Sequence, residues 1–90
     1  MYSLVVTDRY RKKAKKFFLK HPEVIVQYGK VLKLLCLDPK HPSLRLHKLS
    51  GRLDGLFSVS INISYRMVVN FIIKDDQIVP IDIGSHEEVY

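Results

Sequence analysis

The feature that most constrains the fold is a change of hydrophobic period at Pro39-Lys40-His41-Pro42. Before this turn apolar residues recur at helical spacing, and after it they alternate with polar residues. An amphipathic helix and a half-buried strand each carry one apolar side that another element must cover. The sequence therefore predicts an α+β fold in which helices pack on one face of a sheet.

Two helices are predicted before the turn. The first begins at Thr7 or Asp8, either of which is a good N-cap, and ends before His21-Pro22. The second ends at Asp38-Pro39, and the short connection between them predicts a helical hairpin. Their apolar stripes are Tyr10, Ala14, Phe17 and Phe18 in the first and Val24, Ile25, Tyr28, Val31, Leu32 and Leu35 in the second.

One short strand is predicted before the helices and three or four after them, followed by a short C-terminal turn of helix. The predicted strands are Leu4–Val6, Leu44–His47, Phe57–Ile63, Tyr65–Ile73 and Ile78–Ile83. Alternation predicts that Phe57, Val59, Ile61 and Ile63 line the core. The opposite face is unusually polar and is predicted to carry Arg45, His47, Ser58, Ser60, Asn62, Arg66 and Asn70.

Length and composition predict a single domain over residues 1–90. No apolar run approaches the roughly 20 residues of a membrane span, and the first residues are too short for a signal segment, so a soluble cytoplasmic protein is expected. The lone Cys36 excludes an internal disulfide and is expected to be a core residue.

The net charge of +6 is unevenly distributed along the chain. Residues 1–53 carry 13 Lys and Arg against 3 Asp and Glu, a balance of +10, whereas residues 54–90 carry 2 against 6, a balance of −4. A basic half favours polyanionic partners such as RNA, DNA or an acidic protein segment. The alternative is a solvated surface that keeps the protein in solution.

The C-terminal segment Gly84–Tyr90 places a histidine and an aromatic residue four positions apart. In a helical turn, this spacing puts His86 and Tyr90 on one face. Ser85 and Glu88 stand at the spacing of a capping box, which is compatible with a functional site at the same place.

A polar sheet face that carries an arginine and histidines suits RNA cleavage by the attack of a 2′-hydroxyl. That reaction needs a base, a cation to stabilise the phosphorane and an acid for the leaving 5′ oxygen. Histidine suits the proton transfers because its unperturbed pKa is roughly 6.5, and the planar fork of arginine can contact two phosphate oxygens. His86, His47 and Arg66 are the candidates. No metal or other cofactor is expected, because the sequence has no carboxylate cluster, no CxxC pair and no Gly-rich phosphate motif.

Other residues on or near this face have secondary roles. Tyr90 is predicted to stack on a base, or else to anchor the C-terminal segment. Arg45 and Lys48 are predicted to position the RNA backbone, or else to be solvated charges. His47 has a structural alternative as a surface strand residue, and Arg66 as a side chain that snorkels at the sheet edge.

Three segments, His41–Gly51, Tyr65–Val69 and Ile81–Tyr90, resemble the RelE/StbE-type toxins of bacterial type II toxin–antitoxin modules, and most closely their YafQ-like branch. The resemblance spans the whole chain. It implies a RelE/ParE-like fold of two N-terminal helices on a curved, mainly antiparallel sheet of four or five strands, in the order β-α-α-β-β-β-short α.

The same resemblance implies an activity and partners. Members of the family cut mRNA in the ribosomal A site without a metal, and an acidic antitoxin that is partly disordered when free inhibits them. The family's strand His and strand Arg match His47 and Arg66, and its C-terminal His and aromatic residue match His86 and Tyr90. Its partners would be the ribosome with its mRNA and a cognate antitoxin, with no membrane.

The chain also departs from the family pattern. Relatives often carry a second strand His and an acid where this chain has Ser58, Ser60, Asn62 and Ser64, and a Trp where it has Leu56 and Phe57. His47 and His86 would therefore divide the acid and base roles between them. Two other functions stay open: a ParE-like inhibitor that binds DNA gyrase without catalysis, and a decayed toxin that only binds an antitoxin.

Overall fold

The computed structural model describes all 90 residues, in the element order that the sequence predicts. Its helices and strands are β1 (Ser3–Leu4), α1 (Asp8–Lys20), α2 (Ile25–Leu37), β2 (His47–Lys48), β3 (Phe57–Ser60), β4 (Tyr65–Ile72), β5 (Gln77–Ser85) and α3 (His86–Val89). The predicted α+β class is confirmed.

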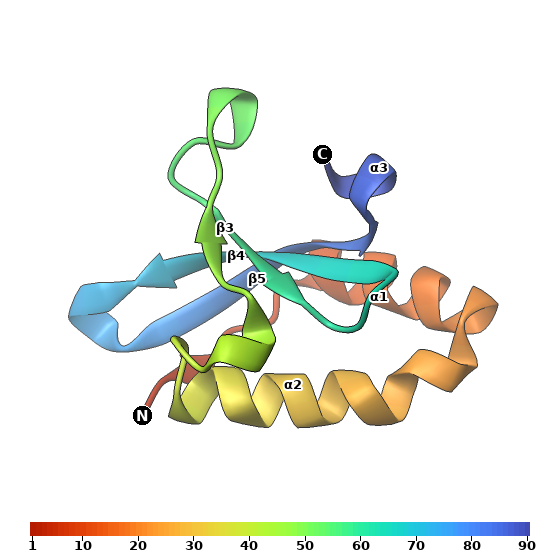
Figure 1. Cartoon of the computed structure of the whole chain (residues 1–90), viewed down its shortest axis with the longest axis horizontal. Helices are drawn as coiled ribbons and strands as arrows, with labels where there is room; N and C mark the ends of the chain where they lie inside the picture. Colours follow the sequence, from red (N-terminus) through yellow and green to blue (C-terminus); the bar gives the residue numbers. More distant parts are fainter.

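A single five-stranded sheet, in the order β1-β5-β4-β3-β2, forms the middle layer of the molecule. Only β1 and β5 run parallel, so the sheet is mainly antiparallel as predicted. Helix α2 lies on one side of the sheet and the short α3 lies on the other (Figure 1). None of the helices is both long enough and apolar enough to cross a membrane.

The helix ends follow the local signals in the sequence. Thr7 is the N-cap of α1, since its hydroxyl oxygen accepts a hydrogen bond from the Tyr10 amide at 3.1 Å. Helix α1 stops at Lys20, two residues before Pro22, and α2 stops at Leu37, two residues before Pro39. The two proline breaks therefore set the length of the hairpin.

The core joins both helices to the centre of the sheet. Tyr10 of α1 is 2% exposed, and its hydroxyl lies 2.7 Å from that of Tyr28 in α2 and 3.6 Å from the sulfur of Met67 in β4. Burial raises the pKa of both tyrosines above the ordinary value, so both phenols stay neutral. Around them pack Phe17, Val31, Leu35, Val59, Val69 and Ile78. Both helices therefore pack on the same face of β4.

Strand register decides which side chains share the other face. His47, Ser58 and Val68 lie side by side across β2, β3 and β4. Residues opposite one another in a sheet point to the same side, and so do residues two apart. Arg66, two residues from Val68, thus shares this face.

A β-bulge interrupts the pairing of β4 with β5. Val68 lies opposite Asp82 whereas Val69 lies opposite Pro80, so Ile81 has no partner of its own. A bulge of this kind bends its strand and increases the local twist. The bend occurs where β5 passes α1 on its way to α3.

Two predictions about β3 are wrong, and both have the same cause. The strand ends at Ser60, and Ile63, predicted to line the core, is 98% exposed. The Asn62 side-chain oxygen accepts hydrogen bonds from the Ser64 and Tyr65 amides, both at 2.9 Å. This side-chain turn reverses the chain before Ile63 could join the strand.

The predicted strand Leu44–His47 is also corrected. Leu44 is buried at the end of a 3-10 turn, and Arg45 takes the left-handed conformation, with φ at 47°. Extended pairing begins only at His47. Arg45 therefore lies in the turn before β2 and outside the polar row of the sheet. The first strand is likewise shorter than predicted, because only Ser3–Leu4 pairs with β5.

Candidate active site

Helix α3 folds back tightly over the end of β5, and Gly84 permits this. A Cβ at Gly84 would lie 3.1 Å from the Glu88 Cβ and 3.4 Å from the Val89 Cγ1, closer than most such contacts. Gly84 lies opposite Arg66 in the sheet, so α3 covers the sheet beside that arginine. Val89 is 2% exposed and anchors the helix.

The predicted capping box at the start of α3 is present. The Ser85 hydroxyl oxygen accepts from the Glu88 amide at 3.3 Å, and the Glu88 carboxylate accepts from the Ser85 amide at 2.9 Å. The backbone hydrogen bond from Ser85 lowers the pKa of Glu88 below its ordinary value. The cap fixes the orientation of the first residue of α3, His86.

His86 and Tyr90 form the pair that their spacing predicts. Their ring centroids are 4.3 Å apart in an edge-to-face arrangement, with His86 exposed and Tyr90 half-buried. Two contacts hold Tyr90: its hydroxyl donates to the Ser58 hydroxyl of β3, and its main-chain oxygen accepts from Arg52 Nη2 at 3.0 Å. The aromatic ring is thus fixed between β3 and the loop that contains Arg52.

Arg66 in β4 is the cation of this face. It is half-buried, and its Nη1 atom is buried without any hydrogen-bond partner. A buried polar group without a partner is costly, and an unpaired guanidinium nitrogen is more costly still. Its direct neighbours across the sheet, Ser60 and Gly84, carry no charge. Within the chain, nothing neutralises this side chain.

His47 lies at the far edge of the same face. Its neighbour across the sheet is Ser58, the residue that holds the Tyr90 hydroxyl. The ring is exposed, and its Nδ1 lies 3.4 Å from the Arg45 carbonyl oxygen. Strand β2 is two strands from β4, and Arg66 lies two residues along β4 from Val68, the residue in register with His47. The backbones of His47 and Arg66 are therefore roughly 12 Å apart.

The structure thus brings four of the six candidate residues to one face: His47, Arg66, His86 and Tyr90. Arg45 lies in the preceding turn, and Lys48 is paired with Phe57, whose side chain packs on the helix side of the sheet. Lys48 therefore emerges on the face opposite His47.

Two residues of the site have no signal of their own in the sequence. Ser58 was predicted to face solvent, yet it is 0% exposed because α3 and Tyr90 cover it. Arg52, in the 3-10 turn Gly51–Leu53, holds the main chain of Tyr90 from 38 residues away. The Gly84-x-His86 spacing is the one local hint that the C-terminal segment folds back closely onto the sheet.

The arrangement offers proton transfer and phosphate binding. Two exposed imidazoles, those of His47 and His86, share this face with the Arg66 guanidinium. The Tyr90 ring packs against His86 and its hydroxyl reaches Ser58, the neighbour of His47. No three His, Cys, Asp or Glu side chains are grouped to hold a metal ion. The face therefore carries one cation of the kind that binds phosphate and two side chains of the kind that transfer protons.

No protein-family model matches the sequence, and no curated protein matches it. Solved structures match over nearly the whole chain. YafQ from E. coli gives a TM-score of 0.80 at 12% identity and covers 100% of this chain and 99% of its own. A metal-bound toxin from Helicobacter pylori gives 0.80 at 20% identity, with 100% of both chains covered.

A YoeB–YefM complex from Staphylococcus aureus also matches, with a TM-score of 0.73 at 18% identity over 96% of this chain and 98% of the matching chain. At such identities, the likeness establishes the fold. The predicted resemblance is thus confirmed in three dimensions. The chain has the RelE/YafQ fold, which it shares with the toxins YafQ and YoeB.

Proposed function

We propose that this protein is the toxin of a type II toxin–antitoxin pair and that it cuts mRNA on the ribosome. The observation that carries the proposal is the position of Arg66, a half-buried cation without an ion pair in the chain, on the sheet face that also carries His47, His86 and Tyr90. An anionic substrate bound at this face would pair with the charge of the guanidinium. The fold shared with YafQ and YoeB supports the same function.

In the proposed reaction the substrate supplies its own nucleophile. The RNA 2′-oxygen attacks the adjacent phosphorus, one histidine accepts its proton, and the bond from phosphorus to the 5′ oxygen breaks. The other histidine donates a proton to that oxygen, so the products are a 2′,3′-cyclic phosphate and a 5′-hydroxyl. Arg66 stabilises the extra charge on the phosphorane, and Tyr90 orients the base or the phosphate beside His86.

Neither Arg45 nor Lys48 shares the sheet face of Arg66. In this proposal they therefore take no part in the reaction and hold the RNA backbone that flanks the cleavage site. His86 lies beside the Tyr90 ring, and His47 is paired in the sheet with Ser58, whose hydroxyl accepts from Tyr90. This geometry suits a division in which each histidine serves one of the two proton transfers.

The proposed protein partner is an acidic antitoxin. The balance of +10 in residues 1–53 is complementary to such a segment, and YoeB from Staphylococcus aureus was crystallised with YefM. Binding across the sheet face would cover Arg66 and exclude RNA.

The test is primer extension on a defined mRNA in a purified translation system, with and without ribosomes. Wild type is expected to cut within codons only when ribosomes are present, and His86→Ala is expected to cut roughly 100-fold or more slowly. The matched control is His41→Ala, which removes an exposed histidine from the turn after α2 and should cut normally. Equal cutting by His86→Ala would contradict its role. Intact mRNA with gyrase-trapped DNA breaks would replace the proposal with a ParE-like function.

A further inference from the structure

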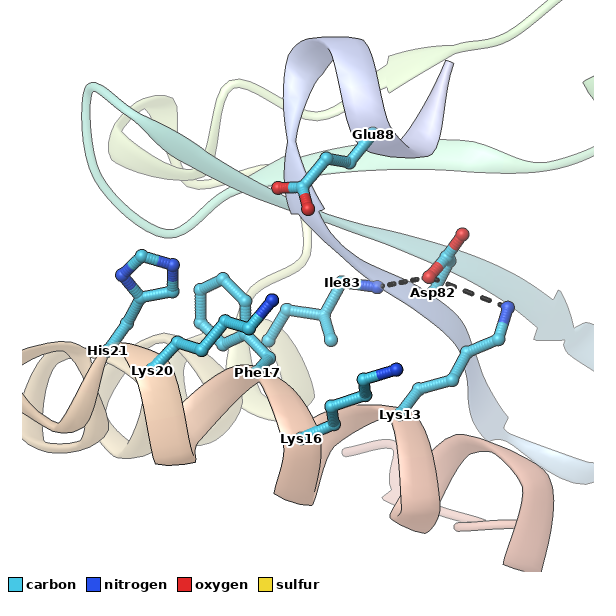
Figure 2. Close-up of a pocket in the computed structure, with 8 residues that line it drawn as sticks. All are labelled: Lys13, Lys16, Phe17, Lys20, His21, Asp82, Ile83 and Glu88. Carbon is cyan, nitrogen blue, oxygen red and sulfur yellow. Dashed lines mark hydrogen bonds and ion pairs between the residues drawn. The ribbon is translucent and has the colours of Figure 1, made fainter.

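The basic face of α1 contains an ordered stripe of cations. Arg9, Lys13, Lys16 and Lys20 are separated by four, three and four residues, so they lie on one side of the helix. The stripe extends over the 12 residues from Arg9 to Lys20 and is therefore roughly 16 Å long. Figure 2 shows its lysines rising from α1 toward β5 and α3.

These cations line two hollows that meet end to end. The first, about 440 Å³, lies between the start of α1, the Arg52 loop and the bulge of β5. The second, about 380 Å³, lies between the end of α1, β5 and α3 (Figure 2). Lys13 and Asp82 line both hollows, and their ion pair at 3.6 Å lies at the boundary between them. The two hollows together are called here the α1 trough.

The charge of the α1 trough is not balanced within the chain. Its two carboxylates already have partners: Asp82 accepts from the Ile83 amide at 2.9 Å and lies 3.6 Å from Lys13 Nζ, and Glu88 accepts from the Ser85 amide. Lys16 and Lys20 pair with no carboxylate, and neither does Arg9. The trough therefore has a surplus of positive charge in both hollows, from Arg9 in the first and from Lys16 and Lys20 in the second.

The α1 trough leads directly to the candidate site. Arg52 lines its first hollow and also donates to the main chain of Tyr90. Val68, on the floor of that hollow, lies opposite Ser58 and two residues from Arg66. Arg52 and Val68 thus place the first hollow beside the candidate site.

We propose that the α1 trough binds the phosphate backbone of single-stranded RNA that extends from the cleavage site. The inference rests on the proposed function for the identity of the strand. A groove of lysines and arginines without base-specific contacts is the usual device for holding a single strand regardless of sequence. The proposal gives Arg9, Lys16 and Lys20 a role in substrate binding and none in the chemical step.

An acidic protein segment is the competing occupant, and the lining of the second hollow argues against it. Protein partners gain most of their affinity by burying aromatic and aliphatic anchors in apolar pockets. The second hollow has only two apolar lining residues, Phe17 and Ile83, and Phe17 is already buried in the core. The rest of its lining is charged or ionisable, as expected for a bound backbone.

The test measures RNA binding directly, without cleavage. The probe is a fluorescein-labelled 2′-O-methyl oligonucleotide of about 12 nucleotides, which a 2′-hydroxyl mechanism cannot cut. Lys16→Gln/Lys20→Gln is compared with Lys12→Gln/Lys15→Gln, which removes two exposed lysines of the same helix that line neither hollow. Affinity is measured by anisotropy over a range of salt concentrations.

Loss of the trough lysines is expected to weaken binding several-fold and to reduce the slope of log K against log salt by roughly 1.4, because each phosphate contact on a single strand adds about 0.7. The control pair should leave the slope unchanged. Equal losses in both variants, or no RNA binding by wild type, would overturn the inference. The inference would also be overturned if the trough substitutions weakened the binding of a poly-glutamate peptide but left the affinity for RNA unchanged.

Failure of the proposed function gives a different result. If the trough binds RNA as expected but wild type never cuts mRNA on ribosomes, the α1 trough stands and the nuclease does not. If wild type cuts and the trough variant cuts equally well at limiting mRNA, the nuclease stands and the trough does not.

Discussion

Arg66 shows a conflict between stability and function within one residue. Its buried Nη1 lacks a hydrogen-bond partner, although a guanidinium can donate five hydrogen bonds. A polar group left in this state lowers the stability of the fold by roughly 1–3 kcal/mol. Such costs persist in proteins chiefly where a ligand removes them.

Arg66→Met is therefore expected to stabilise the protein while it destroys activity. The substitution keeps the aliphatic stem and removes the unpaired group, so the free energy of unfolding should rise by about 1 kcal/mol. Cleavage of mRNA should fall by roughly 100- to 1,000-fold, because the phosphorane loses its cation. Urea denaturation and primer extension measure the two effects. A less stable variant would show that Arg66 is a structural residue.

Ser58 and Tyr90 are expected to act as one energetic unit. Tyr90→Phe leaves the Ser58 hydroxyl buried without its donor, and Ser58→Ala leaves the Tyr90 hydroxyl without its acceptor. Each single change should lower the free energy of unfolding by about 1 kcal/mol, and the double variant should lose little more than either. Additive losses in urea denaturation would mean that the hydrogen bond contributes nothing. Tyr90→Phe keeps the ring beside His86 and therefore separates the hydroxyl from the stacking role.

At the scale of elements, α3 is the least self-sufficient part of the fold. A helix of four residues cannot be stable by itself, so α3 depends on its cap, on buried Val89 and on the contacts of Tyr90. It also carries His86. The position of a proposed catalytic group thus depends on a few local contacts.

The cap of α3 is expected to respond to pH through Glu88. The pKa of Glu88 is lowered in the folded protein, so its contribution is complete above the ordinary carboxyl pKa of about 4.3 and is lost as the pH falls through the folded value. The NMR methyl signals of Val89 should shift toward an undocked state in that acidic range. Glu88→Gln should abolish this step, whereas Glu87→Gln, an exposed neighbour outside the cap, should keep it.

What the sequence predicts well are the elements whose signals are local. The two proline breaks and the Thr7 cap locate the helices, and alternation locates β4 and most of β5. The pattern fails at Ile63, because one side-chain oxygen of Asn62 turns the chain, and apolar alternation carries no information about that hydrogen bond.

The candidate site divides in the same way. The pairing of His86 with Tyr90 follows from helical spacing, so it is predictable. The burial of Ser58 and the Arg52 hydrogen bond depend on where α3 docks, between segments far apart in the chain. A single sequence contains no local signal for such contacts.

At the scale of the whole molecule, the Tyr10–Tyr28–Met67 contact connects α1, α2 and β4 in one core. We therefore expect residues 1–90 to unfold as one cooperative unit. Urea unfolding followed by far-ultraviolet circular dichroism and by tyrosine fluorescence should give the same midpoint. The five tyrosines report on both layers, because Tyr10 and Tyr28 lie in the helices and the other three lie in or beside the sheet and α3. Different midpoints would show that part of the fold unfolds separately.

The bulge in β5 gives this strand a tolerance that the other strands lack. Because Ile81 has no partner, its removal would leave Pro80 opposite Val69 and Asp82 opposite Val68, with every remaining side chain on its present face. Removal of Met67 from β4, which has no extra residue, would instead move every side chain on one side of the deletion to the opposite face of the sheet. Thermal melting should show a folded protein after the first deletion and none after the second. Strand β5 holds one residue more than its pairing with β4 requires. It can therefore lose one residue without moving core side chains to the face of the candidate site.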